Sequence, residues 1–130
     1  MKKEERCAKH PCVCVVCEGG AARRVFGGAG VSTESGIPDF RSAEGLYVQK
    51  SPVPPETILR HAFFMRHPDL FYSFYREKIL APDALPNGAH IALAELEKRG
   101  KVDCVVTQNI DGLHQKAGSV HVLELHGTTR

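Results

Sequence analysis

Residues 27–47, with the sequence GGAGVSTESGIPDFRSAEGLY, restrict the fold more than any other stretch of this 130-residue chain. They follow a short run at 24–26 that ends in valine and phenylalanine. A buried strand that stops at glycine is typical of the entrance to a phosphate-binding turn. Gly28 and Gly30 carry no Cβ, so a ligand can approach the backbone closely, and residues 31–35 can begin a helix whose N–H groups favour an anion. A plain tight turn is the alternative interpretation.

The loop after this turn carries charged and aromatic side chains. Thr33 stands where the usual dinucleotide fingerprint has its third glycine, so an ordinary dehydrogenase loop is not expected. Asp39, Phe40 and Arg41 then follow one another in a segment too rich in glycine and proline for regular structure. Loops of this kind usually close over a ligand. The alternative is a surface ion pair between Asp39 and Arg41, with Phe40 in the core, which contributes little to stability.

Two further apolar runs also end in polar residues. Residues 102–106 are nearly all apolar, as expected for a strand buried on both faces, and the polar cluster TQNIDG follows at 107–112. A third strand is predicted at 120–125 and ends at His126 and Gly127. The carboxyl ends of parallel strands meet at one edge, so these clusters are predicted to converge on one ligand site. The sequence therefore predicts an α/β fold with a Rossmann-like parallel sheet and flanking helices.

Helices are predicted between the strands, at 56–64, 68–80 and 86–100, and from 113 onward. The third begins at the N-cap Asn87 and completes a βαβ crossover; its predicted apolar face is formed by Ala89, Leu93 and Leu96. In the second helix three residues lie on one side and are predicted to be mostly core, namely Phe71, Phe74 and Ile79.

His126 is the candidate for acid–base chemistry, because imidazole is the side chain most easily tuned to act as a base near neutral pH. The chain has seven histidines, so position has to discriminate among them. His126 sits at a predicted strand end before a glycine, and a structural role is the alternative. His114 is predicted to be structural or to border the site.

Composition favours one modest globular domain, with 42% hydrophobic and 25% charged residues. The net charge of +2 is too mild to indicate nucleic acid as a partner. The sequence shows neither a secretory nor a transmembrane pattern, so no membrane partner is expected. Five cysteines without an export signal indicate a reducing compartment, and a cytoplasmic location is predicted.

Residues 1–21 form a segment of their own, a cysteine-rich N-terminal tail before a domain at 22–130. Its soft ligands are Cys7, His10, Cys12, Cys14 and Cys17. The Cys14-x-x-Cys17 pair could hold zinc together with two of the others. A metal site of this kind usually has two separated pairs, so a loose thiol-rich tail is the favoured interpretation, and metal binding is left open.

Three motifs together resemble the sirtuin family of NAD-dependent protein deacylases. They are GAGVSTESGIPDFRS from Gly28, TQNIDGLH at 107–114 and ELHG at 124–127, in the family's order. The resemblance covers about residues 22–130 and implies a partial, incomplete NAD-binding catalytic domain. It implies acetylated protein lysines as substrates, acyl transfer to ADP-ribose and release of nicotinamide. The family's four-cysteine zinc module is expected beyond this chain. Gly27 departs from the family, because many members have threonine there.

The resemblance also implies roles for individual residues. His126 would be a base toward a ribose hydroxyl, and Asn109 would hold the ribose and an ordered water; these two are the implied catalytic residues. Phe40 would cover the nicotinamide pocket, and Asp111 with the backbone near Ile110 would hold the nicotinamide amide. The full implied cofactor-binding set is Gly28, Ala29, Gly30, Ser32, Asp39, Phe40, Arg41, Tyr47, Gln108, Asn109, Ile110, Asp111 and His126.

Tyr72 and Tyr75 are the implied substrate-binding residues, and they bear on which acyl group the protein prefers. Family members that remove acidic acyl groups pair a tyrosine with an arginine three residues later, and here that position is Tyr75. Arg76 lies about 100° further around a helix, so a neutral acyl group such as acetyl is expected. Three other functions are left open: a non-catalytic NAD or ADP-ribose binding module, a mono-ADP-ribosyl transferase, and a metal-binding regulatory fragment.

Overall fold

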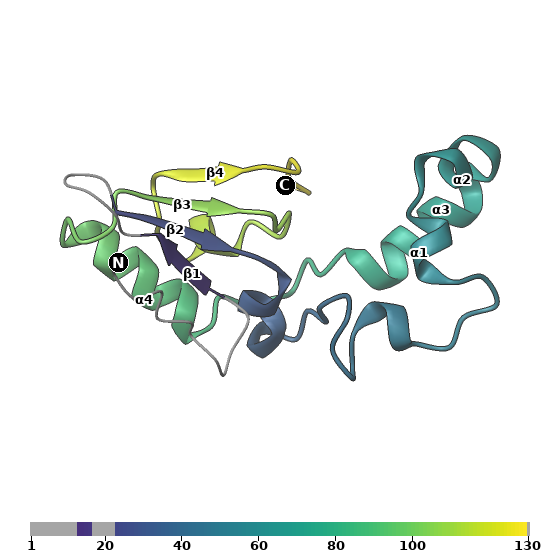
Figure 1. Ribbon diagram of the computed structural model, residues 1–130, viewed down its shortest axis with the longest axis horizontal. Coiled ribbons are helices and arrows are strands. Elements are labelled where there is room, and N and C mark those ends of the chain that lie inside the picture. The colour runs from purple at the N-terminus through teal and green to yellow at the C-terminus, as the bar shows by residue number, and fades with distance from the viewer. Residues whose placement is uncertain (1–12, 17–22, 130) are drawn as a thin grey trace, which may run out of the picture.

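A computed structural model describes residues 13–16 and 23–129 of the chain. Its centre is a four-stranded sheet in the order β1-β2-β3-β4, and the strands are β1 (Val13–Val16), β2 (Arg24–Gly27), β3 (Cys104–Thr107) and β4 (Val122–Glu124). β2, β3 and β4 are parallel, and their carboxyl ends point the same way (Figure 1). The predicted α/β fold with a parallel sheet and flanking helices is therefore confirmed, with the second and third predicted strands somewhat shorter than expected.

Strand β1 was missed by the sequence analysis, which assigned residues 1–21 to a loose tail. β1 runs antiparallel to β2, with Val13 opposite Gly27 and Val16 opposite Arg24. The segment VCVV has the β-branched residues that strands favour, but Cys14 and the cysteines around it suggested metal chemistry instead. Cys7, His10, Cys12 and Cys17 lie outside the described residues, and only the backbone of Cys14 is described.

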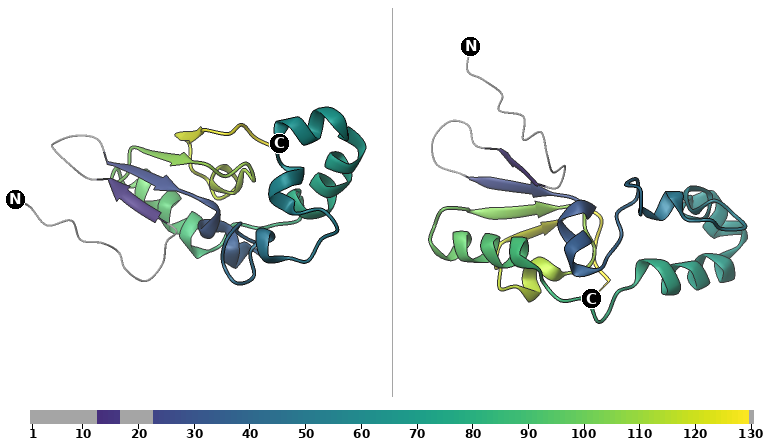
Figure 2. Two further views of the ribbon diagram at one scale, coloured as in Figure 1. Left: turned by 45° about the vertical axis from the view of Figure 1, so that its right-hand side comes forward. Right: turned by 90° about the horizontal axis from the view of Figure 1, so that it is seen from below.

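The core lies between the sheet and helix α4 (Gly88–Lys98), which runs along one face of the sheet (Figure 2). Leu93 of α4 packs with three buried valines of the sheet side, Val25, Val102 and Val105. Val25 and Val105 lie opposite each other in the β2–β3 register. This register also places Gly27 opposite Thr107, so the two strands end side by side. The segments that follow β2 and β3 therefore begin next to each other.

Helix η1 (Ala29–Ser35) follows β2 directly, and it is a 3₁₀-helix that begins two residues before the predicted helix start. It is bounded by two glycines, Gly28 in an extended conformation and Gly36 in the left-handed region at φ +80°. Past the loop come η2 (Leu46–Val48) and, after β3, α5 (Leu113–Lys116).

A helical arm, residues 55–79, stands beyond the carboxyl ends of the parallel strands (Figure 1). It contains α1 (Pro55–Ile58), α2 (His61–Arg66), α3 (Pro68–Phe74) and the π-helix η3 (Tyr75–Ile79). The helix predicted at 56–64 is wrong as a single element, because Arg60 takes an extended conformation and separates α1 from α2. The helix predicted at 68–80 continues through η3, where the Leu80 N–H donates to the Tyr75 carbonyl at 3.0 Å.

The aromatic residues of the arm do not form a buried core, contrary to the sequence prediction. Phe71, Phe74 and Ile79 are half-buried, and no residue of α2, α3 or η3 is buried. The rings pack on one another instead, with Phe71 4.9 Å from Phe64 and 5.6 Å from Tyr75 between ring centroids. A short arm with no second layer has nothing to bury them against. Within the described residues no helix has the length and apolar character to cross a membrane.

Candidate active site

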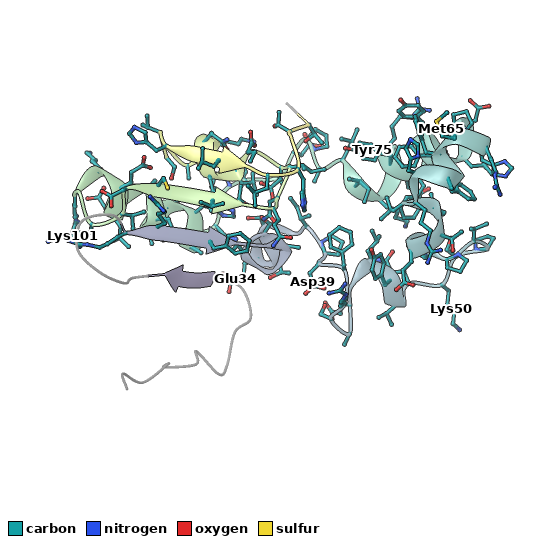
Figure 3. All side chains as sticks on the ribbon, turned by 45° about the horizontal axis from the view of Figure 1, so that its top comes forward. Glu34, Asp39, Lys50, Met65, Tyr75 and Lys101 are labelled. Atoms are coloured by element: carbon teal, nitrogen blue, oxygen red, sulfur yellow. The ribbon has the colours of Figure 1, made fainter. Side chains whose placement is uncertain are left out.

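One cavity of about 1030 Å³ lies where the three parallel strands end and the arm begins. Ala29 after β2, Asn109 after β3 and His126 after β4 all line it. Tyr75 of the arm lines the opposite side, and Figure 3 shows it on the part of the arm nearest to the sheet. The prediction that the polar strand ends share one crevice is confirmed.

Ser32 is the centre of a buried hydrogen-bond cluster in the cavity floor. Its Oγ donates to Asp111 Oδ2 at 2.7 Å and accepts from Asn109 Nδ2 at 3.0 Å. Ser32 is buried by its place in η1, which holds the hydroxyl toward the end of β3. The cluster therefore ties the segment after β2 to the segment after β3 through side chains that both line the cavity.

The loop after β3 is fixed by its own short-range hydrogen bonds. The Asn109 N–H donates to Thr107 Oγ1 at 3.0 Å, and the Leu113 N–H donates to Asp111 Oδ1 at 2.9 Å. Gly112 between them has φ +70°, a conformation that suits glycine. Both carboxylate oxygens of Asp111 are thus engaged, while the Oδ1 atom of Asn109 is not used by the bond to Ser32.

His90 belongs to this cluster, although the sequence analysis did not select it. It is fully buried at the third position of α4, where its Nδ1 accepts from the Asn87 N–H at 3.2 Å. The proton of the neutral ring is therefore on Nε2, which lies 3.5 Å from Ser32 Oγ. Burial lowers the pKa of His90, against an opposing effect of the Asp111 carboxylate. A polar residue three positions after an N-cap asparagine was the signal that could have identified it.

His114 lies behind His90, with 4.8 Å between the ring centroids, in agreement with its predicted structural or bordering place. It is 1% exposed, and neither ring nitrogen has a hydrogen-bond partner. Burial, reinforced by His90, lowers the pKa of His114 to about 4, so the ring is neutral at physiological pH. The position of a Cβ on Gly27 would be 3.8 Å from His114 Nε2.

The loop at 36–47 places Phe40 at the cavity and turns its neighbours away. Phe40 lines the cavity, is 40% exposed and packs against Tyr47 with 5.3 Å between ring centroids. Asp39 accepts from the Ser42 N–H at 2.9 Å, and hydrogen bonds from Ser42 lower the pKa of Asp39. The ion pairs found in the described part of the chain do not include one between Asp39 and Arg41. Figure 3 shows Asp39 on the connection between sheet and arm.

The structure thus brings together most of the predicted site residues. Those that line the cavity are Ala29, Ser32, Phe40, Tyr75, Gln108, Asn109, Ile110, Asp111 and His126. Those that do not line it are Gly28, Gly30, Asp39, Arg41, Tyr47 and Tyr72. Tyr72 is 50% exposed on the arm, so of the two predicted substrate tyrosines the cavity receives only Tyr75. Where side chains are described, no group of three or more His, Cys, Asp or Glu residues could hold a metal ion.

A glycine turn after one parallel strand and a cavity at the carboxyl ends of three define a Rossmann-like α/β protein with a ligand site at the strand ends. Residues 28–130 match the Sir2 family, and the chain belongs to that family.

The chain is similar to curated proteins named NAD-dependent protein deacetylase. It is 60% identical over 105 residues to the one from Clostridium perfringens and 62% identical over 104 residues to the one from Clostridium tetani. These matches cover 79% and 78% of this chain but 43% and 42% of the relatives, so the chain spans less than half of their length.

Solved structures of Sir2 proteins show the same fold. A Sir2 variant with a deacetylated p53 peptide and 3′-O-acetyl ADP-ribose has a TM-score of 0.73 and 48% identity, over 79% of this chain and 41% of that one. A Sir2 homologue in complex with ADP-ribose has a TM-score of 0.73 and 42% identity, over 81% of this chain and 41% of that one.

Proposed function

We propose that this chain carries the catalytic centre of an NAD-dependent protein-lysine deacetylase. The observation that supports the proposal is that Ser32, Asn109, Asp111 and His126, from three strand ends, line one cavity. The similarity to curated deacetylases and to Sir2 structures with ADP-ribose adds support. The chain spans less than half of those relatives, so activity, substrate and cofactor are all part of the proposal.

The cavity residues fit NAD by their chemistry. A Cβ at Gly28 would meet nothing within 4 Å, so the turn after β2 leaves the backbone open to a close ligand. The buried Ser32–Asn109–Asp111 cluster offers fixed polar groups for a ribose or an amide. NAD, when bound, would supply an electrophilic ribose carbon and accept the acyl group. Ala29 and Ser32 would hold its phosphate side, and Asn109 and Asp111 its nicotinamide ribose side.

His126 would act as the base of the reaction. It lies two residues past β4, lines the cavity and precedes Gly127, which has φ +79°. An imidazole that lines the cavity can serve as a general base toward a ribose hydroxyl of the bound ligand.

Asn109 and Asp111 would orient the ligand rather than exchange protons with it. Asn109 uses its amide N–H on Ser32 and keeps its side-chain oxygen for a hydroxyl or a water. Asp111 is held by both oxygens, so its carboxylate cannot rotate. The Ile110 carbonyl accepts two hydrogen bonds from Thr129, through its N–H at 3.0 Å and its hydroxyl at 2.8 Å. A preorganised set of this kind lowers the cost of reaching the transition state.

The acyl group is proposed to be neutral, with acetyl as the simplest case. The cavity has an apolar wall, formed by Tyr75 and Leu59 on the side of the arm and by Phe40 of the loop at 36–47. Arg76 does not line the cavity, and its Nε donates to the Tyr72 carbonyl of its own helix at 3.2 Å. A guanidinium bound in this way does not face an acyl chain.

A cytoplasmic location, and the absence of nucleic acid and membrane among the partners, stay predictions from composition. Binding of zinc or another metal by the cysteine-rich N-terminal segment is likewise untested.

The proposal is tested by mixing the purified chain with NAD and an acetyl-lysine peptide. The expected products are nicotinamide and O-acetyl-ADP-ribose in equal amounts, measured by liquid chromatography with mass detection. The matched variant His126→Ala should lose both products while NAD still binds in a direct titration. Saturable NAD binding without nicotinamide release would instead identify a binding module. Nicotinamide release with ADP-ribose attached to protein would identify a mono-ADP-ribosyl transferase.

A further inference from the structure

The helical arm has a second, smaller hollow that the proposed chemistry does not use. It has a volume of about 160 Å³ and is separate from the large cavity; its lining residues are Thr57, Arg60, Ala62, Phe63, Arg66 and His67. All of them come from α1 and α2 and from the residues that bound α2. These elements lie at the end of the molecule away from β1 (Figure 1).

The geometry of α2 explains why these side chains gather. Arg60 is its N-cap and His67 its C-cap, and Phe63 lies between them. All three of these residues line the hollow. The ring centroids of Phe63 and His67 are 5.0 Å apart, so the phenyl ring supports the imidazole at the edge of the hollow.

The two arginines of this hollow have no counter-ion within the described chain. The ion pairs found there join Lys78 to Glu77, Arg99 to Glu95 and His121 to Glu97, and none involves Arg60 or Arg66. No hydrogen bond from either guanidinium to the described residues is present, although Arg76 and Arg99 each have one. No carboxylate lines the hollow.

The chemistry of the lining selects an acidic side chain as the occupant. A guanidinium presents paired donors that match both oxygens of a carboxylate, which a single ammonium does not. Phe63 and Ala62 provide an apolar floor for the methylene groups that precede the carboxylate. We propose that this hollow binds an aspartate or glutamate of the protein substrate, close in sequence to the acyl-lysine.

The hollow and the large cavity are adjacent along the chain. Leu59 lines the large cavity and the next residue, Arg60, lines the hollow, so their Cα atoms are about 3.8 Å apart. The proposal places the acyl-lysine of one peptide in the large cavity and a nearby residue of the same peptide over α2. The choice of a substrate peptide rests on the proposed function, whereas the carboxylate site rests on the arm alone.

The test compares two acetyl-lysine peptides that differ by glutamate or glutamine at two to four residues from the lysine. Their affinities for the full chain are measured by fluorescence anisotropy at low and high salt. The glutamate peptide is expected to bind about 3- to 5-fold more tightly at low salt, the range of one surface ion pair. Salt should remove the difference, because the groups are exposed.

Variants on exposed positions locate the effect. In Arg60→Gln/Arg66→Gln the preference for glutamate should disappear, while in the control Arg76→Gln it should persist. In Arg60→Glu/Arg66→Glu the preference should invert in favour of a peptide with lysine at that position. Equal affinities in the unchanged protein, no measurable binding of either peptide, or a preference that survives in Arg60→Gln/Arg66→Gln would each overturn the proposal. Deacetylation assays on the same peptides separate the two hypotheses. Turnover without a glutamate preference contradicts only this inference. A glutamate preference without turnover contradicts only the proposed function.

Discussion

The hydroxyl of Ser32 donates a hydrogen bond to Asp111 Oδ2 at 2.7 Å, across 79 positions of the sequence. Ser32 follows β2 and Asp111 follows β3, so the bond forms only when these two strands lie in parallel register. Asn109 donates to the same hydroxyl, and His90 Nε2 approaches it at 3.5 Å. The folded sheet thus brings Asn109, Asp111 and His90 together around one atom, the Ser32 hydroxyl oxygen.

Replacing Ser32 by alanine is expected to lower both the stability of the fold and the rate of the reaction. The change removes one partner from Asn109 and one from Asp111, and leaving buried polar groups unpaired costs about 1–3 kcal/mol. Freed rotation of both side chains should lower the rate of nicotinamide release by about 10- to 100-fold, the usual scale for a lost orienting group. Urea unfolding and a nicotinamide assay measure the two effects. Thr33→Ala is the matched control, because its hydroxyl bonds only to the nearby Gly30 carbonyl and is exposed; a similar loss in this variant would contradict the prediction.

The strand ends were predictable because local chemistry and topology agree there. Val25 and Val105 are buried, as the apolar runs predicted, and the residues after each strand are polar. Because parallel strands end at one edge of a sheet, these polar residues indicated one site there. His90 could not be selected by the same reasoning. It stands on the α4 face predicted to consist of Ala89, Leu93 and Leu96, yet Leu96 is 40% exposed. The hydrogen bonds of His90 to the Asn87 backbone and toward Ser32 rotate the buried face toward the cluster.

The arm could be predicted only in part, because its packing is decided by what stands next to it. Helical patterns at 56–64 and 68–80 were readable, but the break at Arg60 and the π-helix at 75–79 follow no proline or glycine. The aromatic periodicity that indicated a core is real, since Phe64, Phe71 and Tyr75 do pack together. The spacing of the aromatic residues identifies which of them touch. Their burial would need a further helix or sheet packed on the arm, and the described residues do not supply one.

Glycine is required at position 45, and Gly45→Ala should disturb the loop that carries Phe40. An added Cβ would be 2.7 Å from the Arg41 nitrogen and 2.7 Å from the Phe40 carbonyl carbon, both backbone atoms that cannot simply rotate away. The resulting shift should cost about 1–3 kcal/mol of stability. It should also weaken NAD binding, because Phe40 lines the cavity. Thermal unfolding and NAD titration are the measurements. Gly88→Ala is the control, since a Cβ there meets nothing within 4 Å. Unchanged stability and unchanged NAD affinity in Gly45→Ala would contradict the prediction.

Acid is expected to destabilise the protein through His114. Burial holds its pKa at about 4 in the folded protein, below the value of 6.5 for a histidine whose pKa is unperturbed. Between these two values the unfolded chain binds more protons than the folded one, so stability falls as pH falls from about 6.5 to 4. The lowered pKa of His90 acts in the same direction. The full shift of His114 corresponds to about 3 kcal/mol. Urea unfolding at pH 7.5 and 4.5 should show a smaller loss in His114→Leu than in the unchanged protein; equal losses would show that other groups control the acid sensitivity.

The two ring nitrogens of His114 have no hydrogen-bond partner among the described residues, and a substitution at Gly27 can supply one. A Cβ at this position would lie 3.8 Å from His114 Nε2 and 3.4 Å from Val31 Cγ2, which is ordinary contact, and the residue is in a strand that any side chain can occupy. A threonine hydroxyl here can reach Nε2 and satisfy a buried group that now has no partner. Gly27→Thr is therefore expected to raise the free energy of unfolding by about 1–2 kcal/mol. Gly27→Val adds the same bulk and strand preference without the hydroxyl, so the difference between the two variants isolates the hydrogen bond. Equal stability of the threonine and valine variants would show that the hydroxyl does not meet the imidazole, and a stability below that of the glycine protein in both would show that the space beside Val31 is too small.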